Sequence, residues 1–154
     1  MQHISKRTGG SILLTELFTA LYAFSEENFR GLIEIRSDCG EGERVKISAE
    51  YIIYFLKLML KCTEGERFFK IYASSEDGVL TVRHNTDYPF SLSRTEQSNL
   101  TCYALKAGFN IKFTDRSIIL YAELDRGAKI ASIYNHTAKS LSKIFEQAFI
   151  DSLQ

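Results

Sequence analysis

The sequence has no excess of charge of either sign and almost no proline. Its 154 residues include 19 basic and 19 acidic side chains, for a formal net charge of +0. Broad binding to nucleic acid or to a membrane surface requires a basic excess, so we expect neither partner class. The single proline, Pro89, and the absence of low-complexity linkers and internal repeats leave no candidate domain boundary. The chain therefore predicts one domain, residues 1–154, with one sizeable core.

Closely spaced cysteines and long apolar runs are also missing. Cys39, Cys62 and Cys102 lie far apart with no CxxC pair, which favours reduced and mostly buried thiols in a cytosolic protein. No apolar run approaches the roughly 20 residues that a membrane span needs, and residues 1–7 contain no apolar signal core. We therefore expect a cytoplasmic protein without a membrane partner.

Patterns that mark metal sites and catalytic triads are absent. His3, His84 and His136 show no metal-ligand spacing, and no Ser/His/Asp or Cys/His arrangement can be argued from spacing. The acidic turn at 38–43 lacks the ligand spacing of a calcium loop. The tyrosines are scattered and predict no stacking platform. We expect no metal site.

Helical periodicity is present in four segments. Apolar residues recur near a 3.6-residue period, or occupy nearly every position, in segments separated by glycine and polar turns. Ser93 and Glu96 form a capping-box pattern, and Gly108 is a plausible helix stop. The predicted helices cover residues 11–29, 48–62, 94–107 and 129–152.

Strand patterns fill the intervals between these helices. Asp77-Gly78 is a favoured two-residue hairpin turn. Six strands are expected, at residues 32–36, 44–47, 67–74, 79–84, 110–113 and 117–124. Hairpins interspersed with helices predict an α+β fold, a two-layer α/β sandwich. Its sheet is mixed but mostly antiparallel, its helices lie on one face, and an extra C-terminal helix follows the core.

This order of elements, over about residues 11–124, resembles the ATPase domain of the GHKL superfamily, which includes histidine kinases, anti-sigma-factor kinases, gyrase and Hsp90. In that family the helix before the hairpin carries Asn-Leu-Leu-x-Asn-Ala, and the run at 57–62 here is Lys-Leu-Met-Leu-Lys-Cys. Both asparagines fall on lysine, Lys57 and Lys61. The second asparagine holds Mg²⁺ in the family, and an ammonium has no acceptor to replace it. It could contact phosphate as a point charge, although lysines that snorkel from a buried helix are the plainer interpretation.

The family's second motif, Asp-x-Gly-x-Gly, follows the second hairpin strand. His84 stands in place of the aspartate that accepts a hydrogen bond from adenine, and Asn85 follows it. Thr86 and Tyr88 replace the two glycines that let the backbone approach the nucleotide. A neutral imidazole could accept one hydrogen bond, but Tyr88 adds bulk where space is needed.

The third motif, Gly-x-Gly-Leu-Gly, opens the next helix in the family and holds phosphates on backbone amides. The corresponding run at 94–100 contains no glycine, and Glu96 would repel phosphate. The link from Tyr88 to Ser93 is too short for the family's usual ATP lid. All three changes adjoin one pocket, so we expect no cofactor, with ATP and Mg²⁺ as the alternative.

The resemblance implies a non-catalytic, histidine-kinase-like domain that acts as a protein-interaction or regulatory module in bacterial signalling. One alternative is an ATP-binding kinase of the anti-sigma or histidine-kinase type in which Asn85 or Asp87 supplies the lost contact. Another is a phosphotransfer protein that uses His136, which lies off the apolar stripe of the last predicted helix. The phosphoacceptor pattern usually has a flanking acidic residue, and Asn135-His136-Thr137 has none.

The predicted C-terminal helix is an addition to the family core. Its apolar stripe must be covered, because an exposed apolar surface of that length would associate. We expect this helix to pack on its own domain and to allow a homodimer. A protein partner is therefore expected, with a second copy of the chain as one possibility.

Overall fold

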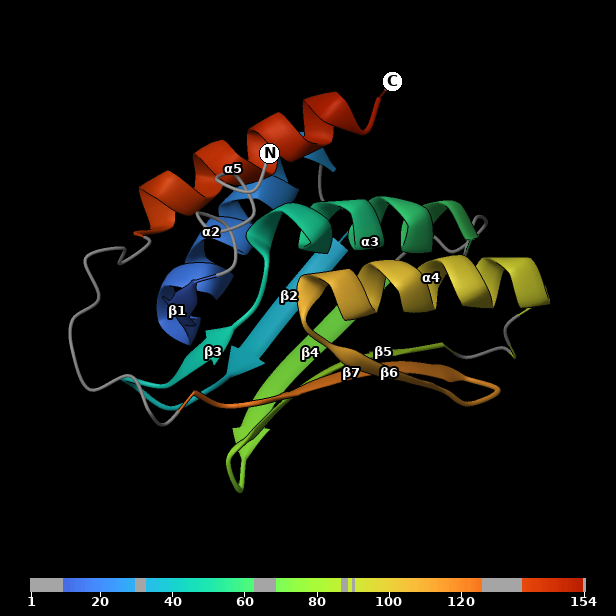
Figure 1. Ribbon diagram of the computed structural model, residues 1–154, viewed down its shortest axis with the longest axis horizontal. Coiled ribbons are helices and arrows are strands. Elements are labelled where there is room, and N and C mark those ends of the chain that lie inside the picture. Colours follow the sequence, from blue (N-terminus) through green and yellow to red (C-terminus); the bar gives the residue numbers. More distant parts are fainter. Residues whose placement is uncertain are drawn as a thin grey trace.

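The computed structural model describes residues 10–29, 33–62, 69–86, 89, 91–125 and 137–153. These residues form seven strands and four helices in two sheets. The helices lie on one side of the larger sheet, which confirms the predicted α+β class and layering (Figure 1).

The larger sheet has five strands in the order β2-β4-β5-β7-β6. β2 and β4 are parallel and every other pair is antiparallel, so the sheet is mixed as predicted. Asp77 and Gly78 both adopt positive φ, 53° and 78°, as the tight hairpin between β4 and β5 requires. The strands are β2 (Ile33–Asp38), β4 (Phe69–Glu76), β5 (Val79–Asn85), β6 (Asn110–Phe113) and β7 (Ser117–Glu123).

The smaller sheet corrects the first predicted helix. β1 (Ser11–Leu13) pairs with β3 (Arg44–Lys46), and the helix α2 begins only at Leu14 and ends at Asn28. Ser11 is therefore a strand residue and not the start of the helix that the sequence predicted over residues 11–29. The apolar period continues through the strand because Ile12 is fully buried, so burial alone did not distinguish the last strand residue from the first helical turn.

Helices α3 (Ala49–Cys62) and α4 (Arg94–Ala107) pack side by side over the sheet. Ser93 caps α4 by accepting a hydrogen bond from the Glu96 amide, so the predicted capping box is confirmed. Gly108 ends the helix with a φ of 103°. A Cβ at this position would lie 2.9 Å from the Lys46 carbonyl oxygen, which explains why the helix stop is a glycine.

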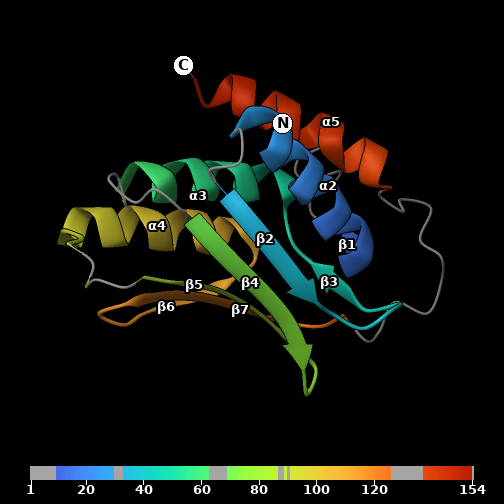
Figure 2. The same ribbon diagram turned by 180° about the vertical axis from the view of Figure 1, so that it is seen from behind.

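Helix α5 (Ala138–Asp151) is shorter than predicted. Thr137 is its N-cap, so the helix does not run through Thr137, and residues 129–136 of the predicted helix lie outside the described residues. The apolar stripe of α5 packs on α2 and α3 of the same chain rather than on the open sheet face (Figure 2). None of the helices in the described part of the chain combines the length and apolar character that crossing a membrane requires.

Candidate functional site

Of the two lysines on α3, Lys57 is used to hold α5. Its ammonium donates a hydrogen bond to the Ser152 carbonyl at 3.1 Å and lies 5.3 Å from the centre of the Phe149 ring. A cation at this place is favourable because carbonyls at a helix C-terminus carry partial negative charge. Lys61, one turn later, is exposed to solvent. The structure therefore separates the roles of two residues that the resemblance places in one motif.

A second contact fixes the other end of α5. The Glu16 carboxylate on α2 accepts a hydrogen bond from the Ala138 amide at 2.6 Å. Between these two ends, four phenylalanine rings meet edge to face with centroids 5.7 to 5.8 Å apart. We call this set the docking region: Phe24, Phe29, Phe145 and Phe149, together with Lys57 and Glu16.

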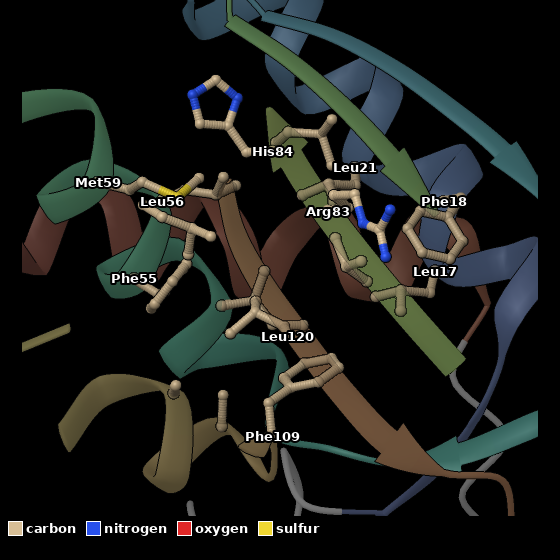
Figure 3. Close-up of a pocket in the computed structure, with 16 residues that line it drawn as sticks. Leu17, Phe18, Leu21, Phe55, Leu56, Met59, Arg83, His84, Phe109 and Leu120 are labelled. Atoms are coloured by element: carbon tan, nitrogen blue, oxygen red, sulfur yellow. The ribbon is translucent and has the colours of Figure 1, made fainter. Parts of the chain in front are cut away.

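His84 is 2% exposed and points from β5 into the space between the sheet and the helices (Figure 3). Its Nδ1 lies 2.9 Å from the Lys70 carbonyl oxygen, which can only accept, so Nδ1–H is the donor. The predicted aspartate position therefore does face the interior. The histidine there is held by a backbone hydrogen bond of the sheet.

The residues after His84 are engaged at the edge of the sheet. Asn85 is exposed on the opposite side of β5, and its Oδ1 accepts a hydrogen bond from the Ser117 hydroxyl at 2.6 Å. The Thr86 amide donates to the Arg116 carbonyl at 2.8 Å. These bonds join the end of β5 to the first residue of β7 and to the turn before it, and neither residue lines the interior space. Asp87, Tyr88 and His136 lie outside the described residues.

The interior space is a cavity of about 50 Å³ beneath α2, α3 and α4. Its walls are apolar except for His84 and for Arg83, whose side chain is exposed to solvent, and they include Leu56, Met59 and Phe109 (Figure 3). Among the described residues that line it, His84 is the one polar residue that is buried.

The N-terminus of α4 closes on itself. Ser93 accepts from the Glu96 amide at 3.1 Å, and the Glu96 carboxylate accepts from the Ser93 amide at 2.9 Å. Hydrogen bonds from Ser93 and then from Cys62 lower the pKa of Glu96. The carboxylate is thus held ionised at the helix end where the resembling family binds phosphate. We call Cys62, Ser93 and Glu96 the capped region.

Cys62, the last residue of α3, completes the capped region. Burial, followed by its hydrogen bond to Glu96 and the charge of Glu96, raises the pKa of the Cys62 thiol to about 11. The thiol is therefore protonated near neutral pH and donates to the carboxylate. The sequence indicated the capping box but gave no signal for this contact, because it joins residues 34 positions apart on two helices.

These residues do not fit a magnesium nucleotide bound as in the resembling family. Mg²⁺ requires oxygen ligands, whereas the α3 positions carry an exposed ammonium and one already bonded to Ser152. The capped region presents a carboxylate where phosphate would approach. Within the described residues, no group of three or more His, Cys, Asp or Glu side chains could hold a metal ion.

The sequence predicted no stacking platform among the scattered residues Tyr72, Tyr88, Tyr103, Tyr121 and Tyr134. Tyr88 and Tyr134 lie outside the described residues, and Tyr103 does belong to a cluster of rings. Tyr103 on α4 stacks with Tyr54 and Tyr51 of α3 at centroid distances of 5.8 and 6.4 Å. The Lys106 ammonium lies 5.5 Å from the centre of the Tyr51 ring. Tyr72 and Tyr121 lie instead on the sheet. Helices α3 and α4 therefore run antiparallel. Tyr51 near the start of α3 contacts Tyr103 near the end of α4, and Cys62 at the end of α3 contacts Glu96 near the start of α4.

Comparison with solved structures identifies the fold. Histidine kinase AdeS of Acinetobacter baumannii matches with a TM-score of 0.50 and 9% identity over 76% of this chain and 68% of that one. The histidine kinase domain of the E. coli osmosensor EnvZ matches with a TM-score of 0.49 and 12% identity over 84% of this chain and 97% of that one. The catalytic domain of histidine kinase ThkA matches with a TM-score of 0.49 and 20% identity over 74% of this chain and 95% of that one.

Sequence comparison adds nothing to this likeness, since no family model and no curated protein matches the chain. At these identities the likeness concerns the fold alone. The chain has a fold like that of histidine kinase domains, as the order of its elements predicted.

Proposed function

We propose that this chain is a histidine-kinase-like domain that transfers no phosphate and acts as a protein-interaction or regulatory module in bacterial signalling. The capped region carries the proposal. A helix N-terminus binds phosphate through free backbone amides and partial positive charge. Here Ser93 occupies the Glu96 amide, and the Glu96 carboxylate adds a full negative charge at the same place.

The α3 positions support the same proposal. Lys57 is committed to the C-terminal end of α5, so a nucleotide that recruited it would have to release that helix. Lys61 is exposed and remains able to contact an anion, but it cannot coordinate Mg²⁺. The signalling assignment rests on the fold shared with a histidine kinase.

Calorimetric titration with ATP and Mg²⁺ tests the proposal. We expect no saturable heat at millimolar nucleotide. The catalytic domain of ThkA, titrated alongside, serves as the reference for the same fold. Tight, Mg²⁺-dependent binding by this chain would show that the proposal is wrong and would favour the kinase with unconventional ligands.

A charge-removal variant makes the negative result informative. If Glu96 is what repels phosphate, Glu96→Gln should weaken the repulsion without supplying Mg²⁺ ligands, so ATP binding should stay undetectable in Mg²⁺ and increase at most slightly without it. A thermal shift with nucleotide follows RT ln(1 + [L]/Kd) and gives an independent readout.

The phosphotransfer alternative can be tested separately from the non-catalytic module and from the kinase with unconventional ligands. His136→Ala should abolish phosphate transfer from a phosphorylated response regulator if that alternative holds. We expect no transfer in either the original chain or the variant.

A further inference from the structure

The sheet has one face without a helix in the described part of the chain. Helices α2, α3, α4 and α5 all lie on the other side (Figures 1 and 2). Because successive side chains alternate, the residues between the buried Ile71, Ala73, Leu80 and Leu120 point away from the helices. Tyr72 and Tyr121 are the large side chains on this open face, with 48% and 39% of their surface exposed.

Charge on the open face is divided into two halves. The registers align Arg36, Tyr72, Arg83, Ile119 and Lys112 in one row across all five strands. The next row, toward the Asp77-Gly78 turn, aligns Asp38, Ser74, Thr81, Tyr121 and Asn110. The rows outside these two extend the same separation, with Glu34 and Lys70 on one side and Glu76 and Glu123 on the other.

The two halves are opposite in sign. The basic half carries four cations and one carboxylate, Glu34, which is 3.2 Å from Arg36. The acidic half carries Asp38, Glu76 and Glu123 and no basic side chain. The neutral total charge of the chain therefore conceals a face with a positive half and a negative half of equal net magnitude.

A two-fold rotation superposes these halves. Ser37, Ala73, Val82, Leu120 and Ile111 lie at one level, midway between the basic and acidic rows. Consider a two-fold axis that runs parallel to this level, across the strands, between two copies whose open faces meet. The axis places each strand opposite the same strand of the second copy, with the strand direction reversed. Lys70 then meets Glu76 of the second copy, Arg36 meets Asp38, and Ile119 meets Tyr121.

We propose that the open sheet face is the contact surface between two copies of this chain, related by that two-fold axis. A closed symmetric contact requires a surface that is complementary to itself. The division of charge makes this face complementary to itself. Salt bridges join the two halves, and Tyr72, Tyr121 and Ile119 supply apolar contact along the axis.

The area of the face predicts the strength of the dimer. Four strand spacings of about 4.8 Å and a strand of eight residues give a face of about 19 by 26 Å, or about 500 Å² for each copy. The total of about 1,000 Å² is at the lower limit for a specific interface. The dimer is therefore concentration-dependent, and salt weakens it because the pairs lie in water-accessible positions.

Other occupants fit less well. A nucleic acid would be attracted to the basic half and repelled by the acidic half that adjoins it. The C-terminal helix, which the sequence predicted as a dimer contact, has Leu141, Phe145 and Ala148 buried against its own chain. The sheet-face dimer does not depend on whether the domain binds ATP.

Charge exchange between Lys70 and Glu76 is the decisive experiment. The two residues are six positions apart on β4, too far for contact within one chain, but they pair across the proposed axis. Sedimentation equilibrium should give a dissociation constant that rises about tenfold in Lys70→Glu and in Glu76→Lys, because each change makes two pairs repulsive. The double variant restores both pairs and should return to within about threefold of the original chain.

Two controls locate the contact. Lys143→Glu changes an exposed charge on α5, and Ile150→Lys changes an exposed apolar side chain of the same helix. Neither should alter dimerisation. Circular dichroism establishes that every variant is folded, which is expected because all the substituted side chains are solvent-exposed.

The proposal is overturned if the original chain is monomeric at high micromolar concentration in low salt. A dimer that is insensitive to the single charge reversals, or that the double variant fails to restore, also overturns it. Loss of the dimer in Ile150→Lys alone would place the contact on α5 instead. Tighter binding of a single-stranded oligonucleotide than of the second copy would assign the face to nucleic acid.

Discussion

The docking region and the capped region lie toward opposite sides of α3 and are stabilised differently. In the docking region, buried phenylalanine rings hold α5 and one lysine is added at the edge. In the capped region, the Ser93 and Glu96 side chains each accept a hydrogen bond from the other residue's backbone amide, and the Cys62 thiol bonds the Glu96 carboxylate. Each contains one residue at a position where the family resemblance implies nucleotide contacts, Lys57 in the docking region and Glu96 in the capped region. The difference indicates that one set of substituted positions now contributes to folding and the other mainly to local charge.

Removal of a buried ring should have the largest effect. Phe145 is fully buried and contacts Phe24 edge to face. Phe145→Ala should lower the free energy of unfolding by about 3–5 kcal/mol, because it removes apolar burial and leaves a cavity. Urea denaturation measures the loss. Ile150→Ala, on the exposed side of the same helix, is the control and should change the free energy by less than about 0.5 kcal/mol.

Removal of the α4 cap should have an intermediate effect. Ser93→Ala leaves the Glu96 amide without its side-chain acceptor, at a cost of about 1 kcal/mol. Hydrogen exchange should quicken in the first turn of α4 and stay unchanged in α5. Ser91→Ala, two residues earlier and outside the capping box, is the matched control. An equal loss in both variants would contradict the cap.

Removal of the lysine in the docking region should have a smaller effect. Lys57→Met retains the aliphatic stem but loses the bond to Ser152 and the contact with the Phe149 ring, at a cost of about 0.5 kcal/mol. Hydrogen exchange should quicken at the end of α5 and not in α4. Lys61→Met is the internal control because Lys61 is exposed, and it should leave exchange in α5 unchanged.

Glu96→Gln should have the smallest effect on stability. Its effect is measured instead by the reactivity of the Cys62 thiol. The carboxylate contributes to raising the thiol pKa to about 11, so its removal lowers that pKa and increases the thiolate fraction. Alkylation of Cys62 at about pH 8 should therefore become several-fold faster. Cys102, which is exposed, should react at an unchanged rate in both proteins. An unchanged rate at Cys62 would show that burial alone sets its pKa.

The pH dependence of stability has a defined sign at the same residue. A thiol pKa raised in the folded chain means that the unfolded chain loses its proton first. The contribution of Cys62 to stability is therefore complete below about pH 9 and declines as the pH rises through about 11.

Local patterns predicted most of the fold because they depend on neighbours in sequence. The Ser93–Glu96 box, the Asp77-Gly78 turn and Gly108 each act over a few residues, and all three stand where the sequence placed them. β1 was missed because three residues are too few to show the alternation of a strand, and its one buried residue, Ile12, also fits the period of the helix that follows. The start of α5 was misplaced because apolar spacing does not mark an N-cap, which Thr137 and Ser140 supply.

The candidate site was less accessible to sequence reasoning. His84 was correctly placed at a strand end, but its inward direction depends on the register with Ile71 and Ile118. The role of Lys57 depends on a helix 95 residues away in sequence, and that of Cys62 on a contact between two helices. Such pairings follow from tertiary packing, which spacing within one element does not encode.

The contacts of α5 also determine when the chain can complete its structure during synthesis. Glu16 and Ala138 are 122 positions apart, and Lys57 and Ser152 are 95 apart. On the ribosome, Phe24 and the adjoining faces of α2 and α3 stay uncovered until the last helix has emerged. During that interval the nascent domain exposes an apolar surface. Such a surface favours aggregation with other chains and is the kind that chaperones bind. Helix α5 thus covers the apolar faces of α2 and α3 only after both have been synthesised.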